Sequence, residues 1–398
     1  MKFGIQYQLN VPRPLDSDQW GPEDEHRIFK EALEQIEFAD KLGFDYVWET
    51  EHHFLEEYSA SSCPEVFLAA VSQRTKNIRL SHGIIHMPPK QNHPARVAER
   101  IATLDIVSDG RVEFGTGEGA TVTEIEGFGT KREEKKEAWE EATRECLRMM
   151  SEVPYPGYNG KYFSMPERNI VPKPLQRPHP PVWVAASRLE TVMVGARLGI
   201  GALGVGFETP EEAEERVSRY YELIRNCRPI GKAINPALAA GGNLMMAKTN
   251  EEAMDRGLRG AQFFGFALGW TNAEVHHGRD HLNREFNKRF GDVGAIRHGE
   301  ELEPDDETQR TLFRAGRRGM FIGAPDFVRE NLRRYEDAHI DIMNFTMQWH
   351  ERKHEHIMES LEMFAKEVMP EFKERHHLHQ KWRAQQLDGV KHEINSSI

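Results

Sequence analysis

The feature of this sequence that most constrains its fold is a regular alternation of short apolar runs with longer amphipathic runs. The short runs are rich in β-branched and aromatic residues, as strands require, and the longer runs repeat their apolar residues at helical spacing. The expected strands are Phe3–Tyr7, Tyr46–Glu51, Ile78–Ile85, Val112–Gly115, Val182–Ala186, Ile200–Val205, Leu238–Ala247 and Ile342–Met347. The expected helices are His26–Leu42, Pro64–Thr75, Pro94–Ser108, Glu133–Ser151, Thr191–Leu198, Pro210–Arg225 and Ala324–Ala338. Eight strands alternating with helices over 398 residues predict an α/β fold of the (β/α)8 TIM-barrel type, with insertions.

An open, doubly wound dinucleotide fold fits less well. Such a fold needs a glycine-rich turn after its first strand, and none follows Phe3–Tyr7. We expect one barrel domain over residues 1–372, with an insertion at about 255–319 and a polar C-terminal tail at 373–398 that either packs outside the barrel or is mobile. The insertion exceeds an ordinary barrel connection, which is typical of lids and substrate loops. A proline- and glycine-rich stretch also predicts a hairpin near Tyr158–Tyr162.

Composition excludes several classes of protein. A formal charge of −12 argues against nucleic acid as a partner, because phosphate binding needs a concentrated basic surface. No run of about 18 apolar residues is present, so no membrane helix is expected. The N-terminus enters a strand directly, without a signal-peptide core, and three widely spaced cysteines form no metal pattern. These features predict a cytoplasmic protein with reduced thiols.

The segment Tyr46–Phe54 is the first functional candidate. It is a buried strand that ends in two glutamates and two histidines, which are costly to bury unless they pair or take part in chemistry. In a parallel α/β sheet the carboxyl ends of the strands carry the active site. The sequence therefore predicts a functional site at the end of this strand.

The chain resembles the bacterial luciferase-like family of flavin-dependent monooxygenases. The matching pieces occur in the family's order over roughly residues 1–372. They are Lys2-Phe3-Gly4, Gly43-Phe44-Asp45-Tyr46-Val47-Trp48, Glu51-His52-His53-Phe54, His93-Pro94, Thr103-Leu104-Asp105, Ser108-Asp109-Gly110-Arg111, Phe114-Gly115, Phe128-Gly129, Pro180-Pro181-Val182-Trp183-Val184-Ala185-Ala186-Ser187 and Val368-Met369-Pro370. The resemblance implies a (β/α)8 barrel that binds FMN, supplied in reduced form by a separate NAD(P)H:flavin reductase. It also implies oxygenation of a small organic substrate through a C4a-(hydro)peroxyflavin.

Within this resemblance His52 occupies the position of the family's catalytic histidine. An imidazole near neutral pKa can manage the protons of reduced flavin and its oxygen adduct, although a structural histidine bonded to Glu51 or to a backbone carbonyl is the alternative. His53 would point to the opposite face of a regular strand, which favours a structural role. The same alternation argues against both histidines binding one metal, and we expect no metal site.

The phosphate end of the flavin has four candidate residues. Ser187, Arg188 and Thr191 follow a strand and open a helix, where backbone N–H groups, hydroxyls and a guanidinium suit an anion. Lys136 falls where the family has a phosphate-binding arginine, with a solvated helix lysine as the alternative. Glu118 replaces another such arginine, so the phosphate shell must differ from that of luciferase.

Three further residues are expected beside the flavin. Ile85 and His86 correspond to a pair that the family joins by a cis peptide bond behind the ring, although His86 fits a core position equally well. Gly117 stands where luciferase has a reactive cysteine, and its glycine would let the chain approach the flavin closely.

The walls of the substrate pocket have apolar candidates. The aromatic run Phe263, Phe264, Phe266 and Trp270 would enclose an apolar substrate and exclude water. Met347 and Trp349 either line the same pocket or belong to the core.

Three other functions are weighed. A deazaflavin-dependent hydride-transfer enzyme of the same superfamily would need no oxygen chemistry. A flavin-binding protein without catalysis is disfavoured because the Glu51-His52-His53-Phe54 motif is intact. A metal-dependent barrel hydrolase is disfavoured because no His-x-His follows the first strand. Relatives of this family are often dimers, so a homo-oligomer is expected.

Overall fold

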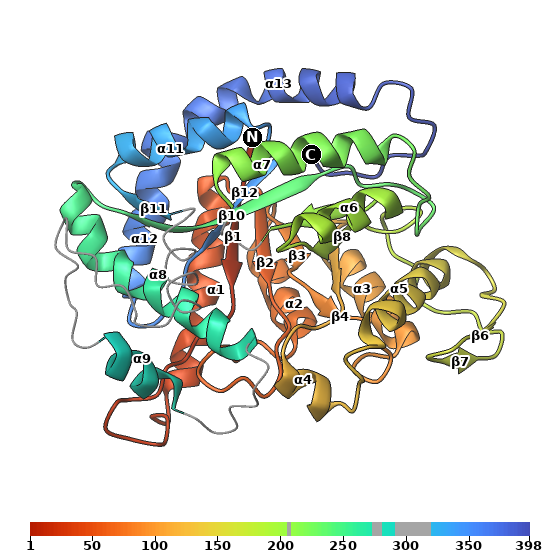
Figure 1. The fold of residues 1–398 in the computed structure, drawn as a ribbon, viewed down its shortest axis with the longest axis horizontal. Helices are drawn as coiled ribbons and strands as arrows, with labels where there is room; N and C mark the ends of the chain where they lie inside the picture. Colours follow the sequence, from red (N-terminus) through yellow and green to blue (C-terminus); the bar gives the residue numbers. More distant parts are fainter. Residues whose placement is uncertain (205–207, 273–280, 291–319) are drawn as a thin grey trace.

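A computed structural model describes residues 1–204, 208–272, 281–290 and 320–398 of the chain. Within these ranges a closed barrel of eight parallel strands forms the centre of the molecule (Figure 1). The barrel strands are β1 (Lys2–Tyr7), β2 (Tyr46–Glu49), β3 (Arg79–His82), β5 (Val112–Gly117), β8 (Val182–Ala185), β9 (Gly201–Leu203), β10 (Leu238–Met246) and β12 (Ile342–Thr346). Each pairs with the next in this order, and β12 pairs with β1 to close the ring. The predicted (β/α)8 TIM barrel is therefore confirmed.

Helices surround the barrel, and several begin where the sequence indicates. They are α1 (Asp24–Leu42), α2 (Pro64–Arg74), α3 (Pro94–Val107), α5 (Lys135–Ser151), α6 (Leu189–Leu198), α7 (Pro210–Ile224), α11 (Pro325–Asp337) and α12 (His354–Met363). Proline occupies the first position of α2, α3, α7 and α11, where its missing N–H costs nothing. At α7, Thr209 and Glu212 form a reciprocal capping box, as the sequence Thr-Pro-Glu-Glu predicts.

Several strands differ in extent from the prediction. The run Ile78–Ile85 divides into β3 and the short strand β4 (Ile85–His86), because a cis peptide bond between Gly83 and Ile84 interrupts it. Expected residue Val205 lies outside the described residues. An extra strand, β11 (Met320–Gly323), pairs with the far end of β10 and was missed. The predicted hairpin is present as β6 (Tyr158–Asn159) and β7 (Ser164–Met165).

The outward-facing residues of the strands pack against the helices. Phe3 of β1 contacts Phe364 of the π-helical turn η1 (Phe364–Val368), with ring centroids 5.0 Å apart, and Phe372 at 5.8 Å. Inside the barrel, Trp48 and Trp183 meet edge to face at 5.2 Å. The Nε1 atom of Trp183 donates to Glu113, which also pairs with Arg79. The interior therefore contains a buried carboxylate that has two partners, Trp183 and Arg79.

The C-terminal residues cover the amino ends of the strands. Helix α13 (Met369–Gln386) extends across the boundary placed at residue 372, and His379 bonds Asp341 at 2.8 Å. The hydroxyl of Tyr46 bonds Ser397 at 2.9 Å. Both termini lie at this end of the barrel, and the short helix α4 (Val122–Gly127) lies at the other end (Figure 1).

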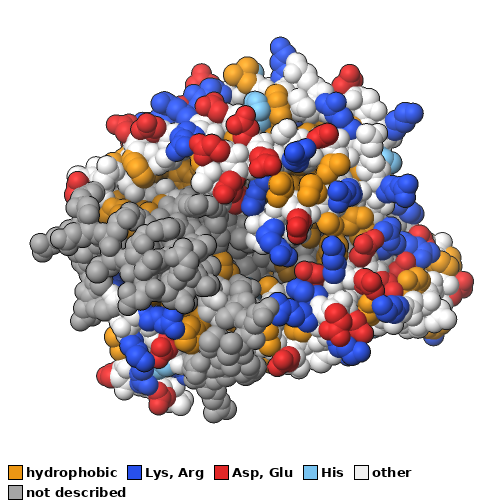
Figure 2. Space-filling model, viewed as in Figure 1, with side chains coloured by type: hydrophobic (Ala, Val, Ile, Leu, Met, Phe, Trp, Pro, Cys, Tyr) orange, Lys and Arg blue, Asp and Glu red, His pale blue; other side chains and the backbone are white. Residues whose placement is uncertain are grey.

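The predicted insertion contains two described helices, α8 (Asn250–Asn272) and α9 (Leu282–Phe290). Its remaining stretches, 273–280 and 291–319, lie outside the described residues. No helix of the described chain is long and apolar enough to cross a membrane. On the face shown in Figure 2, lysine and arginine side chains are interspersed with acidic ones over the described surface.

Candidate active site

The two histidines of the predicted functional segment follow the carboxyl end of β2 and lie in a loop rather than in the strand. The strand ends at Glu49, and the backbone N–H of His52 donates to the carbonyl of Ser61 at 2.8 Å. Phe54 has a positive φ of 64°. Because His52 and His53 are not in a regular strand, the expectation that they point to opposite faces of it was wrong. Their ring centroids lie 6.2 and 6.1 Å from that of His86.

His52 is paired with Glu124, a residue of α4. Its Nδ1 atom lies 3.0 Å from Oε1 of Glu124, whose side chain is fully buried, whereas the His52 side chain is 19% exposed. The Oγ1 atom of Thr121 donates to Oε2 of Glu124 at 2.6 Å. The carboxylate therefore faces His52 and is itself held from behind.

His53 is paired with a different carboxylate. Its Nε2 atom lies 2.9 Å from Oε1 of Glu51, which also accepts from Asn92 at 2.8 Å. The other oxygen of Glu51 accepts from the backbone N–H of His86 at 3.0 Å. The alternative that Glu51 binds His52 is thus wrong, because Glu51 is occupied by His53 and by the β4 strand.

Burial and charge act against each other at these groups. Burial would raise the pKa of Glu124, but His52 and His86 lower it to about 2. Burial would also raise the pKa of Glu51, but the hydrogen bond from His53 and the charge of His86 lower it, and the net shift is downward. Burial lowers the pKa of His86. At neutral pH the centre therefore contains two carboxylates and a neutral His86.

The structure brings Ile85 and His86 of β4 beside Gly117 of β5. Ile85 pairs with Thr116 and His86 with Gly117, in a regular parallel ladder. The expected cis bond is not at Ile85–His86, which form β4, but two residues earlier, between Gly83 and Ile84. The Nδ1 atom of His86 is buried and has no hydrogen-bond partner in the described structure.

Gly117 is needed for packing within the barrel. A Cβ atom at this position would lie 2.4 Å from Cδ1 of Ile84, and one at Gly115 would lie 1.8 Å from the carbonyl oxygen of His82. The close approach that these glycines allow is therefore made by residues 82–84 of the chain itself.

The predicted phosphate residues are divided between two places. Ser187 and Arg188 are exposed just before α6, with Arg188 as its N-cap residue, and Thr191 is half-buried in its first turn. Lys136 is exposed on α5, whereas the neighbouring Lys135 donates to the carbonyl of Gly119 at 2.7 Å and lies 3.2 Å from Glu118. Lys135 is thus the lysine that faces the loop after β5.

An aromatic cluster lies beside His52. The ring of Tyr58 meets that of His52 edge to face, with centroids 5.2 Å apart, and it also contacts Trp349 at 5.7 Å. Phe264 of α8 lies 4.5 Å from Trp349. Phe263, Phe266 and, at the margin, Trp270 belong to the same cluster, whereas Met347 packs in the main core. The aromatic run of the insertion is thus connected to His52 through Trp349 and Tyr58.

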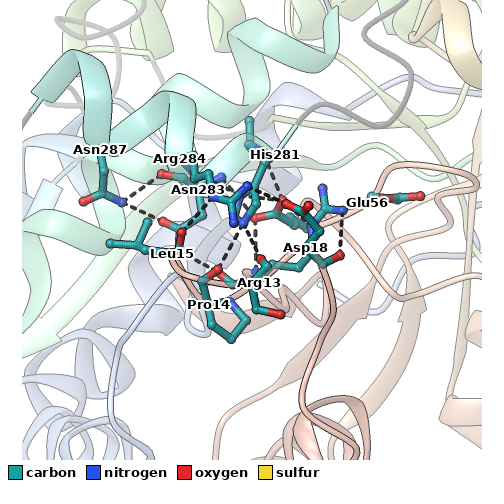
Figure 3. A network of polar contacts seen from close by, with 12 residues as sticks. Arg13, Pro14, Leu15, Asp18, Glu56, His281, Asn283, Arg284 and Asn287 are labelled. Carbon is teal, nitrogen blue, oxygen red and sulfur yellow. Dashed lines mark hydrogen bonds and ion pairs between the residues drawn. The ribbon is translucent and has the colours of Figure 1, made fainter.

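A polar clamp attaches α9 to this region (Figure 3). The buried carboxylate of Glu57 accepts from the backbone N–H groups of Leu282 and Asn283, each at 3.0 Å. Arg13 donates to Glu57 at 2.7 Å, and Asn283 donates to the carbonyl of Arg13 at 2.8 Å. Glu57 directly precedes Tyr58, so the clamp and the aromatic cluster share one loop.

A cavity of about 380 Å³ lies next to the clamp. Its lining includes Arg13, Arg27, Asn283, His350 and Lys353, but neither His52 nor the carboxylates that bind the two histidines. The paired histidines and carboxylates therefore converge in the His52 region and not at this cavity.

The group formed by His52, His86 and Glu124 was also considered as a metal site. Donor atoms of His52, His86 and Glu124 lie within 4.8 Å of one another. However, Oε1 of Glu124 is bonded by His52 and by the backbone N–H of His53, and Oε2 is bonded by Thr121. These bonds orient the histidine and engage both oxygens of the carboxylate, and we continue to expect no metal site.

Sequence reasoning missed Glu124, Lys135 and Tyr58. A signal for Glu124 was present, because Thr121-Val122-Thr123-Glu124 has the spacing of a capping box. Thr121 does cap α4 by accepting from the N–H of Glu124, but the glutamate side chain turns to His52 instead of completing the box. Nothing local to Tyr58 predicts its contact with His52.

A closed parallel barrel with a histidine–carboxylate centre at its strand ends defines a TIM-barrel enzyme. The family model described as luciferase-like monooxygenase matches residues 1–341, and the chain belongs to this family. The predicted resemblance is thereby confirmed, and the family supports an oxidoreductase.

Two relatives and one solved structure illustrate the range of this family. The oxygenase component of a flavin-dependent trigonelline monooxygenase from Acinetobacter baylyi is 26% identical over 381 residues, which cover 93% of this chain and 96% of that protein. An F420-dependent glucose-6-phosphate dehydrogenase from Amycolatopsis mediterranei is 27% identical over 50% of this chain and 59% of its own. The oxygenating constituent of 3,6-diketocamphane monooxygenase from Pseudomonas putida, a type II Baeyer–Villiger monooxygenase solved in complex with FMN, has the same fold. Its TM-score is 0.67 at 18% identity, over 93% of this chain and 98% of that one.

Proposed function

We propose that this protein is the oxygenase component of a two-component, FMN-dependent monooxygenase. The observation that carries the proposal is the position of His52, which lies at the barrel mouth between a buried carboxylate and an aromatic wall. This arrangement combines a group that can hold a proton with an apolar surface that excludes water. Monooxygenation by a reduced flavin needs both.

The residues present fit FMN. At the proposed flavin-ring end of the site, His86 Nδ1 and both polar side-chain atoms of Gln91 are buried without a hydrogen-bond partner among the described residues. Such atoms could bond the polar edge of the flavin ring. At the other end, Ser187 and Arg188 are exposed at the start of α6, where helix N–H groups favour a phosphate. Thr191 adds a hydroxyl, and we propose Lys135 in preference to Lys136 as a further cation.

When bound, reduced FMN supplies the two electrons with which dioxygen is split between the substrate and water. In this proposal His52 holds or moves a proton at its Nε2 atom. Arg188 and the first turn of α6 orient the phosphate, and Tyr58, Phe264 and Trp349 keep water from the reacting side. The substrate is a small organic molecule that contacts this aromatic wall.

The proposal implies a reductase that delivers reduced FMN. It is supported by the trigonelline relative, which is described as an oxygenase component. A homo-oligomer remains a prediction, which light scattering of the eluted protein would test.

A deazaflavin-dependent hydride transfer is the second candidate, because an F420-dependent relative exists. Anaerobic titration of the purified protein with reduced FMN, oxidised FMN and reduced F420 separates the two. We expect reduced FMN to bind at least tenfold more tightly than F420. The reverse order would overturn the proposal in favour of hydride transfer.

The role of His52 is tested by His52→Ala, with His53→Ala as the matched neighbour. We expect His52→Ala to bind FMN but to release peroxide in place of oxygenated product. An unchanged product yield would remove His52 from the mechanism. Binding without any oxygen-dependent turnover in the unmodified protein, over a broad substrate panel, would favour a flavin-sequestering role.

A further inference from the structure

One buried carboxylate holds both the ring of His52 and the backbone beside it. Oε1 of Glu124 lies 3.0 Å from His52 Nδ1 and 3.0 Å from the backbone nitrogen of His53. Oε2 accepts from Thr121 at 2.6 Å. Glu124 therefore uses both of its oxygens and is fully buried, whereas His52 remains partly exposed.

This arrangement decides which nitrogen of His52 carries hydrogen. An ionised carboxylate only accepts hydrogen bonds, so Nδ1 must donate. In a neutral imidazole the hydrogen on Nδ1 leaves Nε2 with its lone pair free. No hydrogen bond to Nε2 is present in the described structure, so this atom is available to a ligand.

The local sequence shows that Glu124 is diverted from a structural task. In a capping box the glutamate would reach back to the N–H of Thr121 and complete the helix start. Here α4 is capped only through Thr121, and the glutamate is directed toward the β2 loop. Its two histidine contacts join elements that are 72 and 71 residues apart in the chain.

We propose that Glu124 is a positioning residue for His52, which fixes its ring and tautomer so that Nε2 faces the reacting side as a proton acceptor. The inference rests on the proposed function only for the use that is made of Nε2. The tautomer itself is a property of the flavin-free protein and is tested there.

The first measurement is the side-chain ¹⁵N NMR spectrum of histidine-labelled, flavin-free protein at pH 8. The His52 signals are assigned by their loss in His52→Gln. We expect the unmodified protein to show His52 with hydrogen on Nδ1 and a bare Nε2. A His52 with hydrogen on Nε2 would overturn the proposal without any variant of Glu124.

The second measurement compares Glu124→Gln with Glu126→Gln, its matched control on the same helix, where the side chain is exposed. The amide in Glu124→Gln has one acceptor oxygen for the three donors that the carboxylate now satisfies. We expect the His52 tautomer to become mixed in Glu124→Gln and to stay unchanged in Glu126→Gln. A pure Nδ1–H form in both variants would overturn the role of Glu124.

Turnover separates this inference from the proposed function. With reduced FMN and substrate, we expect Glu124→Gln to lose product formation at least about tenfold in kcat, with KM for the flavin within about twofold. A changed tautomer with undiminished kcat would leave Glu124 as the residue that orients His52. It would instead overturn the assignment of His52 as the proton acceptor.

Discussion

Glu57 and Leu282 are 225 residues apart in the chain, and the carboxylate of the first accepts the backbone N–H of the second at 3.0 Å. The same carboxylate binds Arg13, whose side chain is almost fully buried. Glu57 directly precedes Tyr58 in the chain. The start of α9 is thus attached to the loop that also contacts His52. A change at Glu57 should be felt both in stability and at the reaction centre.

We therefore expect Glu57→Ala to destabilise the protein by about 3–5 kcal/mol, because Arg13 loses its fully buried carboxylate partner and the N–H groups of Leu282 and Asn283 lose their acceptor. Glu56→Ala is the control, since Glu56 also pairs with Arg13, at 3.1 Å, but its side chain is 35% exposed. The measurement is urea unfolding together with hydrogen exchange of the α9 amides. Equal losses of stability for the two variants would show that burial of the ion pair is not what matters.

Acid should destabilise the protein through His350. Burial and, secondarily, Arg259 lower the pKa of this histidine from 6.5 to about 3. Between these two values the unfolded chain binds the proton and the folded protein does not, so stability is full above pH 6.5 and falls as the pH drops toward 3. The slope is at most about 1.4 kcal/mol per pH unit for one group.

The variant His350→Asn tests this origin, because asparagine tolerates the positive φ of 53° at this position. Urea unfolding at pH 7 and pH 4.5 should show a smaller loss in the variant than in the unmodified protein. His377→Asn, a change at an exposed histidine, is the control and should leave the pH dependence as it is. The same pH dependence in all three proteins would rule out His350 as the cause.

Replacement by alanine should destabilise the protein more at Gly115 than at Gly117, although both glycines lie in β5. At Gly117 the added Cβ meets the end of the flexible Ile84 side chain, so we expect Gly117→Ala to cost about 1–3 kcal/mol. The double variant Gly117→Ala with Ile84→Ala should recover part of that loss. At Gly115 the Cβ meets a backbone carbonyl, so Gly115→Ala should prevent folding at ordinary temperature.

Thermal unfolding of these variants measures the difference. A Gly117→Ala protein as unstable as Gly115→Ala would show that Ile84 cannot move. No coupling between Gly117 and Ile84 in the double variant would contradict the contact.

Arg188 should distinguish flavins by their phosphate. We expect Arg188→Ala to weaken FMN at least tenfold and riboflavin less than about twofold, because only FMN has the phosphate. Lys135→Ala should behave similarly to a smaller degree, and Lys136→Ala, at an exposed helix position, should change neither. Fluorescence titration of each variant with both flavins gives the dissociation constants. Equal weakening of FMN and riboflavin by Arg188→Ala would place the phosphate elsewhere.

The fold follows from patterns that are local in sequence. Each strand and most helices are specified by apolar periodicity and by entry residues such as Thr209-Pro210, and short connections leave a parallel barrel as the way to bury them. The missed strand β11 shows the limit of such patterns. It is only four residues long, Met320–Gly323, and is recognisable only because β10 extends far enough to pair with it.

The candidate site also has a part that local sequence indicates and a part that it does not. His52 could be proposed as a candidate from the sequence alone, because a cluster of ionisable residues at the end of an apolar strand is unusual. Its environment could not, because Glu124 and Tyr58 reach it by tertiary packing, and Glu124 departs from the capping role that its spacing indicates. The position of the cis peptide bond was also predicted wrongly, because it depends on how residues 83–86 pack against β5.

By itself the sequence determined that this protein is an alternating α/β chain of the luciferase-like family, with His52 at the end of its second strand. These features depend on residues close together in the chain. Only the tertiary structure decided which carboxylate binds which histidine, which lysine faces the loop after β5 and how α9 is attached. Those pairings join residues tens to hundreds of positions apart, and their energies depend on burial that no local pattern records.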